Sequence, residues 1–165
     1  MKKSKKIEAP DEELKIPKFL TAYNVPCLYI LMRSDLTSLN PGKAMAQASH
    51  ASNAMVYKAK QLGKRGLGDR LHALFEKWET QTPQGFGTCL VVDADNEMTI
   101  SEAIRDLSRI PSTGGMLGGL INDPTYPVRD GDITHFISVN TCGYVFCDKG
   151  DEAVQEIMSK FPLYK

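Results

Sequence analysis

Uninterrupted apolar runs alternate along the chain with segments of helical periodicity. The run CLYILM at residues 27–32 has no polar position apart from the tyrosine hydroxyl, which is typical of a strand buried on both faces of a sheet. The pattern predicts three further strands at residues 87–94, 115–123 and 141–147. The strand at 115–123 is expected to close in a turn at Asp123-Pro124.

Between these runs, apolar positions recur with the period of a helix. Asn40 offers an N-cap and Pro41 a residue for the first helical position, so a helix is expected from here to about Leu62, ending at Gly63. The next segment, residues 63–70, is predicted to be a loop. Further helices are expected at residues 71–81, 98–110 and 151–161.

This order of strands and helices predicts an α/β fold. We expect a three-layer sandwich, with a small mixed, mostly parallel sheet of about four strands and helices on both faces. Residues 1–24 are charged, lack a clear period and contain two prolines, so they predict an N-terminal arm that Phe19, Leu20 and Tyr23 could dock. Residues 25–165 are predicted to form a single domain, long enough to bury a core.

The helix after Asn40 carries two neighbouring stripes of different character. One stripe is small and apolar, which would let the helix approach the sheet closely; its members are Ala44, Ala48, Ala51, Met55 and Ala59. The adjacent stripe is more polar and consists of Lys43, Gln47, His50 and Ala54.

Lys43 is the unusual member of the polar stripe, because the positive end of the helix dipole disfavours a cation in the first turn. Together with the free amides of the helix end, its ammonium could form a corner for an anion or a developing oxyanion. Spacing alone favours the simpler alternative, in which Lys43 extends into solvent while Gln47 and His50 edge the core.

The net charge of zero conceals a division along the chain. Residues 1–70 hold 13 Lys and Arg against 6 Asp and Glu, whereas residues 71–165 hold 7 against 14. A basic half of this kind can mark an anionic partner, although a basic tail and solvated helix faces would produce the same counts. No apolar run is long enough for a membrane span, and the basic start is followed by charged residues rather than by the apolar core of a secretory signal.

The four cysteines are scattered, with no CxxC pair. Cysteines within predicted strands are typically small core residues, and Cys142 and Cys147, five positions apart, would point to opposite faces of an extended strand. Neither a disulfide framework nor a zinc site is expected, and a reducing cytoplasm fits this usage.

The segment RSDLTSLNPGKAMAQASHA at residues 33–51 resembles the signature of the peptidyl-tRNA hydrolase 2 family. The matching positions are Arg33, Asp35, Leu36, Gly42, Lys43, Gln47, Ser49, His50 and Ala51. A second, weaker block is similar to LINDPTY at residues 120–126 and TCGYVF at residues 141–146, and the chain ends with the family-like Leu163-Tyr164. The likeness covers residues 27–165 in the right order.

The sequence departs from the family pattern at four places. The family usually has a lysine where this chain has Pro41, and its D-A-G-x-T becomes Asp123-Pro124-Thr125. The connection at residues 128–140 is longer than usual, so Thr134 and Thr141 compete for one family threonine. The segment at residues 63–70 is also longer than expected.

The resemblance implies hydrolysis of the ester that joins a peptide to the 3′ end of tRNA, without a metal or organic cofactor. By family position, Lys43, Asp123 and Thr125 would be catalytic. The residues implied to bind substrate are Gly42, Gln47, Ser49, His50 and Thr141. The partner would be the acceptor end of peptidyl-tRNA, held through its phosphates. The oligomeric state stays open between a monomer and a homodimer.

Two other functions are compatible with the same residues. The changes at Pro41 and around Asp123 would suit a non-catalytic module that keeps the fold and binds RNA or a protein. An esterase or amidase acting on a small substrate would instead ignore the tRNA body.

Overall fold

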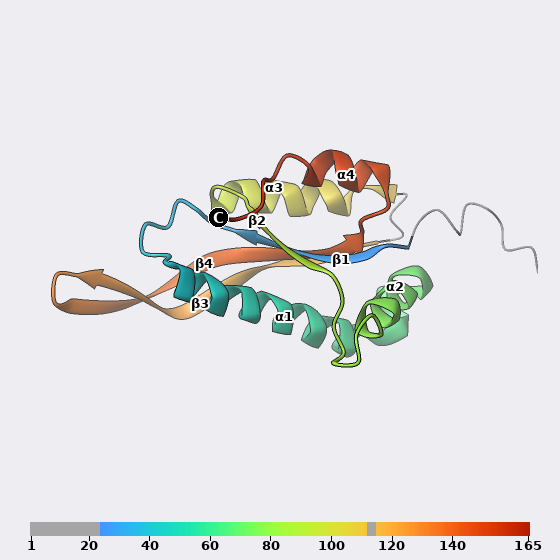
Figure 1. Ribbon diagram of the computed structural model, residues 1–165, viewed down its shortest axis with the longest axis horizontal. Helices are drawn as coiled ribbons and strands as arrows, with labels where there is room; N and C mark the ends of the chain where they lie inside the picture. Colours follow the sequence, from blue (N-terminus) through green and yellow to red (C-terminus); the bar gives the residue numbers. More distant parts are fainter. Residues whose placement is uncertain (1–23, 112–114) are drawn as a thin grey trace, which may run out of the picture.

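Among the residues that the structure describes, the central sheet has four strands and is covered by helices on both faces (Figure 1). The computed structural model describes residues 24–111 and 115–165, so nearly all of the predicted arm, including Phe19, Leu20 and Tyr23, lies outside the described residues. In chain order the elements are β1 (Pro26–Met32), α1 (Pro41–Leu67), α2 (Asp69–Glu79), β2 (Cys89–Asp93), α3 (Glu97–Ser108), β3 (Leu117–Asp130), β4 (Ile133–Asp148) and α4 (Glu152–Met158). The α/β class and the three-layer arrangement are confirmed.

The prediction of a mostly parallel sheet is wrong. The strand order is β2-β1-β4-β3, and only β1 and β2 run parallel, whereas β4 is antiparallel to both β1 and β3. The reason lies in the connection between β3 and β4. Asp130 pairs with Ile133 across a two-residue turn, and a turn this short can join only antiparallel strands. Gly131 in that turn has a positive φ of 58°, the conformation that such hairpin turns require.

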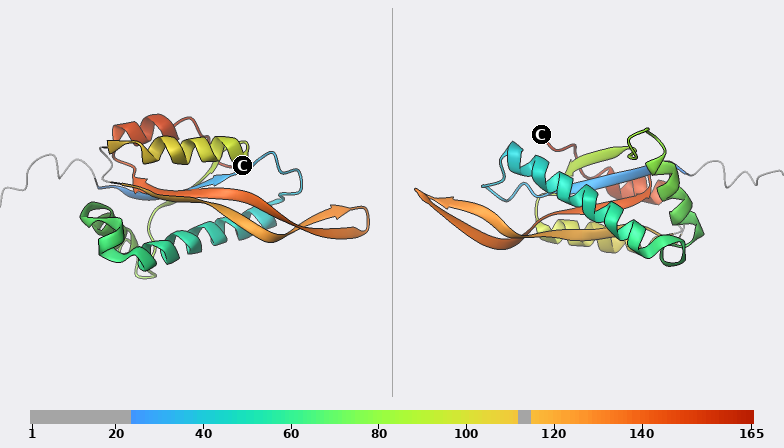
Figure 2. Two further views of the ribbon diagram at one scale, coloured as in Figure 1. Left: turned by 180° about the vertical axis from the view of Figure 1, so that it is seen from behind. Right: turned by 90° about the horizontal axis from the view of Figure 1, so that it is seen from below.

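The two faces of the sheet bury separate cores, because side chains alternate along each strand. On β1, Leu28, Ile30 and Met32 pack with α1 and α2, whereas the alternate residues pack with α3 and α4. Figure 2 shows the two helical layers from behind and from below. All seven residues of β1 are buried, as predicted for this run. β2 lies at an edge and is only half-buried.

The apolar stripe of α1 is confirmed, with Ala44, Ala51, Met55 and Ala59 all buried against the sheet. Gly63 interrupts the helix as predicted, through a left-handed φ of 55°. The loop predicted for residues 63–70 is wrong, however, because another helical turn follows and α2 begins at Asp69. Leu67, which is 7% exposed in the α1–α2 core, explains that turn, since a solvated loop would leave it in water.

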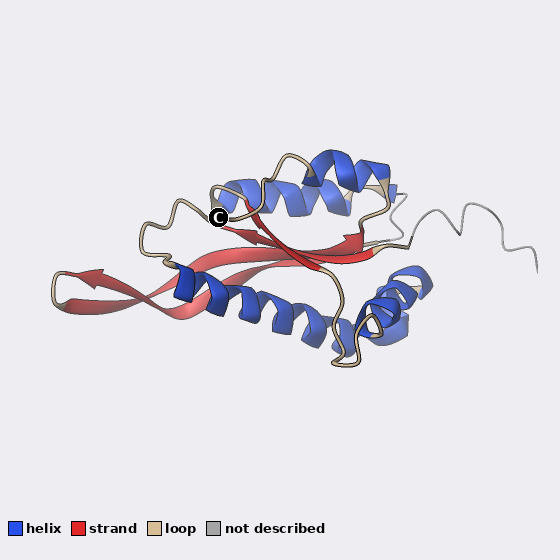
Figure 3. Cartoon of the chain, in the orientation of Figure 1, coloured by secondary structure: helices blue, strands red, loops and turns tan. Residues whose placement is uncertain are grey.

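The turn predicted at Asp123-Pro124 is also wrong. β3 continues through this point to Asp130, and β4 begins at Ile133, so the connection at residues 128–140 is a β-hairpin that projects past the helices (Figure 3). β3 tolerates Pro124 and Pro127 because it is the outermost strand, where a missing N–H removes no ladder hydrogen bond on the open side.

The cysteines follow the alternation of the strands. Cys142 lies in the core beside α1 and Cys147 in the core beside α3 and α4, which confirms that they point to opposite faces. Burial raises the pKa of Cys27 and of Cys142, each to about 12, so both thiols stay protonated at neutral pH. Cys89 is exposed. Over the described part of the chain, no helix is both long and apolar enough to cross a membrane.

Candidate active site

Gln47 connects α1 to both long strands at the end of the sheet where β1 and β2 finish. Its side-chain nitrogen donates to Asp123 Oδ2 at 2.7 Å, and its oxygen accepts from the Thr141 hydroxyl at 2.6 Å. Gln47 is 3% exposed and Thr141 is fully buried. A carboxylate only accepts hydrogen bonds, so the Gln47 amide must turn its NH₂ group toward Asp123. Gln47 therefore does more than edge the core.

A β-bulge brings Thr141 to this position. Ile121 pairs with Cys142 and Asn122 with Asn140, which leaves Thr141 as an extra residue in β4. In a regular strand, the alternation of side chains would turn Thr141 toward α3, on the opposite side of the sheet from Gln47. Bulges commonly re-aim a side chain beside an active site, and here the re-aimed group is the donor that fixes the Gln47 amide.

Arg33 stabilises the bulge from the end of β1. Its Nη1 donates to the Asn140 carbonyl at 2.7 Å, and its other two nitrogens form a bidentate pair with Asp35, both at 2.8 Å. Glu97 completes the cluster by accepting from Arg33 at 3.2 Å and from the Asn140 amide at 2.7 Å. The hydrogen bond from Arg33 holds the pKa of Asp35 below its usual value. Arg33 and Asp35, which both belong to the family-like signature, therefore help to fix the backbone next to Thr141.

Asp123 is held on both carboxylate oxygens. In addition to the bond from Gln47, Oδ1 accepts from the Thr125 backbone amide at 3.0 Å and lies 3.4 Å from its hydroxyl. A second irregularity in the ladder, between Asp123 and Tyr126, makes this local loop possible. Asp123 and Thr125, which the resemblance assigns to catalysis, are thus hydrogen-bonded to each other, and a bulge rather than the predicted turn brings them together.

Lys43 reaches from the first turn of α1 to the base of the hairpin. Its ammonium donates to the Pro127 carbonyl and lies 4.8 Å from the centre of the Tyr126 ring. These contacts offset the unfavourable helix dipole and explain why a cation is tolerated there. The Lys43 backbone amide is capped by Asn40 at 2.9 Å, so this amide is not free to form the predicted anion corner.

The polar stripe of α1 and strand β3 form the two walls of a groove. His50 and Ala54 contribute from the helix, and residues 120–125 from the strand, around a hollow of about 510 Å³. Asp123 and Thr125 both line this hollow. The groove is large enough for a ligand of several non-hydrogen atoms to reach the Asp123 carboxylate. A catalytic role for this carboxylate would require such access.

The family model described as Peptidyl-tRNA hydrolase PTH2 matches residues 27–108. The chain belongs to this family. The matched segment runs from β1 to the end of α3 and includes Arg33, Lys43 and Gln47. No curated protein matches the chain. Asp123, Thr125 and Thr141 lie beyond the matched segment, so their place beside the family signature rests on the hydrogen bonds described above.

Not every residue that the resemblance indicated lies in the groove of this peptidyl-tRNA hydrolase 2 family member. Gly42 and Ser49 are exposed on α1, and Ser49 is two positions from Gln47, on a different side of the helix. Thr134 pairs with Arg129 near the tip of the hairpin, whereas Thr141 contacts Gln47. Tyr126 is 1% exposed, supports Lys43 and accepts a hydrogen bond from Ser38 at 3.2 Å.

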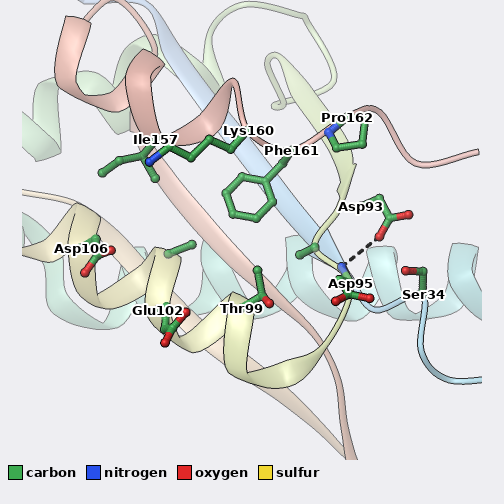
Figure 4. Close-up of a pocket in the computed structure, with 12 residues that line it drawn as sticks. Ser34, Asp93, Asp95, Thr99, Glu102, Asp106, Ile157, Lys160, Phe161 and Pro162 are labelled. Carbon is green, nitrogen blue, oxygen red and sulfur yellow. Dashed lines mark hydrogen bonds between the residues drawn. The ribbon is translucent and has the colours of Figure 1, made fainter.

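A second hollow, on the opposite side of the sheet, has a very different lining. It lies between α3 and the segment after α4, and Figure 4 shows carboxylates around its rim. The acidic residues that line it are Asp93, Asp95, Glu102 and Asp106. Such a surface repels a polyanion. Among the residues that the structure describes, no group of three or more His, Cys, Asp or Glu side chains is placed to hold a metal ion.

Proposed function

We propose that this chain hydrolyses the ester between the peptide and the terminal ribose of peptidyl-tRNA, with Asp123 as the general base. The observation that carries the proposal is the hydrogen-bonded series Thr141–Gln47–Asp123, which fixes a carboxylate at the mouth of a groove. Family membership supplies the substrate class. Hydrogen bonds that hold a catalytic base in place reduce the reorganisation needed when the reaction occurs.

The proposed reaction needs one water molecule and one proton transfer in each direction. Asp123 takes a proton from water as the oxygen attacks the ester carbonyl carbon, which forms a tetrahedral oxyanion. The oxyanion collapses, the bond from the carbonyl carbon to the ribose oxygen breaks, and the proton passes to that oxygen. The products are a peptide carboxylic acid, which ionises at neutral pH, and tRNA with a free terminal hydroxyl.

Asp123 has the capacity to accept from such a water. An ionised carboxylate offers about four lone-pair sites, and the structure fills three of them, counting the long contact from the Thr125 hydroxyl. Asp123 is half-buried at the groove. One site therefore remains for water on the side that substrate would approach.

Lys43 is assigned an electrostatic role in this proposal. Its ammonium carries three donors, of which the Pro127 carbonyl accepts one. The remaining donors and the positive charge would act on the oxyanion or on the terminal phosphate, as family position implies. Gln47 and Thr141 are positioning residues, because they act through Asp123 and are buried.

The tRNA body is proposed to lie on the α1 side of the molecule. Exposed cations follow the second half of α1, at Lys58, Lys60, Lys64 and Arg65. Lys60 and Lys64 are paired with Glu79 and Asp69; Lys58 and Arg65 form no ion pair within the described residues and could contact phosphates directly. The acidic hollow on the far side disfavours the alternative orientation.

A deacylation assay tests the proposal. The chain should release peptide from peptidyl-tRNA whose α-amino group is acetylated, and it should act far more slowly on the same ester carried by adenosine alone, because the α1 cations would then have no phosphates to bind. Salt-dependent tRNA binding without any release would establish the non-catalytic module instead. Equal rates on both esters would indicate a small-molecule esterase.

A further inference from the structure

The two edge strands of the sheet, β2 and β3, differ in whether another segment of the chain pairs with them. Along β2, the C-terminal segment forms a short antiparallel bridge, in which the Asp93 amide donates to Pro162 at 2.8 Å and the Tyr164 amide to Val91 at 3.0 Å. Along the outer side of β3, no described element pairs with the backbone from Leu117 to Asp123. An open edge presents unpaired N–H and C=O groups and is a ready template for another extended chain.

The open edge ends at Asp123, and its last four residues, 120–123, border the groove. Beyond Asp123, Pro124 and Pro127 lack an N–H, and Lys43 occupies the Pro127 carbonyl. Prolines and lysines on an edge discourage strand pairing. Between Leu117 and Asp123 the sequence contains neither proline nor lysine. Every residue of this stretch therefore has a backbone N–H group.

The edge also leads directly to the candidate catalytic carboxylate. The groove between α1 and β3 is lined by His50, Ala54 and residues 120–125, and no Lys or Arg side chain contributes to it. A lining that contains the Asp123 carboxylate and no Lys or Arg suits a peptide backbone better than the phosphates of the tRNA end. The tRNA and the peptide would therefore leave the ester in different directions.

We propose that the peptide of the substrate binds as an added strand along Leu117–Asp123 of β3. The inference rests on the proposed function, because that function identifies the ligand. The ester carbonyl lies at Asp123 and the peptide extends toward Leu117, so the peptide runs parallel to β3. At about 3.3 Å per residue, the edge spans roughly 20 Å, which accommodates about five residues.

Binding through the main chain would allow one site to accept peptides of different sequences. Hydrogen bonds to a strand edge supply affinity without contact to side chains, and only pockets for alternate side chains add specificity. Leu120 and Asn122, two of the residues that line the groove, are exposed rather than set in a deep pocket, so they would impose little selection.

Peptide binding can be measured without turnover by using an uncleavable mimic in which an amide joins the peptide to 3′-amino-3′-deoxyadenosine. We expect acetyl-tetraalanyl-adenosine to bind about tenfold more tightly than acetyl-alanyl-adenosine, a difference of about 1.4 kcal/mol. Methylation of single peptide nitrogens should remove this gain at every second residue only, because alternate N–H groups of a strand face its partner. Exchange of alanine for serine should change the affinity less than twofold.

Two helix variants provide the matching test on the protein. Ala54→Phe fills the groove and should reduce the affinity for the long mimic to that for the short one, whereas Asn53→Phe, at an exposed position on the same turn, should preserve the difference. Equal affinities for both mimics with the wild type, or N-methyl effects without alternation, would overturn the inference. If the alternation appears but peptidyl-tRNA is not hydrolysed, the edge-binding inference stands and the proposed function fails.

Discussion

Gln47→Glu tests the hydrogen bond at the centre of the site with almost no change in shape. The substitution keeps the oxygen that accepts from Thr141 but replaces the nitrogen that donates to Asp123 at 2.7 Å. Two carboxyl oxygens would then face each other at this distance. Like charges so close cannot both ionise easily, so the pair retains a shared proton and its second apparent pKa rises strongly.

The expected effect on stability follows from the sign of that shift. A rise of about 2 pKa units, at 1.36 kcal/mol per unit, corresponds to about 2.7 kcal/mol. Because the folded variant holds a proton that the unfolded chain releases near pH 4.3, its stability relative to wild type is retained below that pH and is lost as pH rises toward the raised pKa. With about 2–4 °C per kcal/mol for a chain of this size, the melting temperature at pH 7.5 should fall by roughly 5–10 °C.

Thermal melts of wild type and Gln47→Glu between pH 4 and pH 8 measure this difference. Gln61→Glu is the matched control, since it makes the same change at an exposed position of α1, one turn after Lys58. The control should show no loss of stability as pH rises. If the melting temperatures of Gln47→Glu and wild type stay within 2 °C of each other across the whole range, Gln47 does not contact Asp123 as described.

Three further predictions concern other parts of the molecule. Lys43→Ala should lower kcat for peptidyl-tRNA by about 10²-fold with a smaller change in KM, and an effect confined to KM would contradict its role at the ester. Replacing Lys58 and Arg65 together by Ala should reduce the slope of log affinity for tRNA against log salt by about 2, as expected for two lost duplex contacts, whereas Arg105 and Lys160, on the α3–α4 side of the sheet, should give no change when replaced. Iodoacetamide at pH 8 should modify Cys89 in the native protein and reach Cys27 and Cys142 only after unfolding, because these two are buried with pKa values of about 12; rapid modification of all three would contradict the described packing.

The stripes on α1 could be predicted from the sequence because helical periodicity is a local property. The same pattern placed Lys43, Gln47, His50 and Ala54 on one side of the helix, and the structure puts β3 opposite them. The burial of Gln47 could not be predicted this way. It depends on Thr141 and Asp123, which are 94 and 76 positions away and supply the hydrogen bonds that make a buried amide tolerable.

The errors in the second half of the chain share one physical cause. Pro124 indicated a turn because proline cannot donate to a ladder, yet this objection disappears on the open side of an edge strand. The extra residue at Thr141 reverses the alternation of side chains within β4, and no local pattern signals such a bulge. Strand order and bulges depend on pairing between distant segments, so the antiparallel pairing of β4 with β1 and β3 and the exact placement of Thr141 emerged only from the structure.

The role of Asp123 as the base is tested most directly by single-turnover hydrolysis of acetylated peptidyl-tRNA in ¹⁸O-labelled water. The wild type should release peptide whose new carboxylate contains one ¹⁸O atom, because water attacks the carbonyl carbon. Asp123→Asn, which keeps the shape of the side chain, should have an unchanged melting temperature within a few degrees and a rate lower by at least about 10²-fold, as expected for loss of a general base. A variant that hydrolyses the ester at the wild-type rate would contradict the assignment of Asp123.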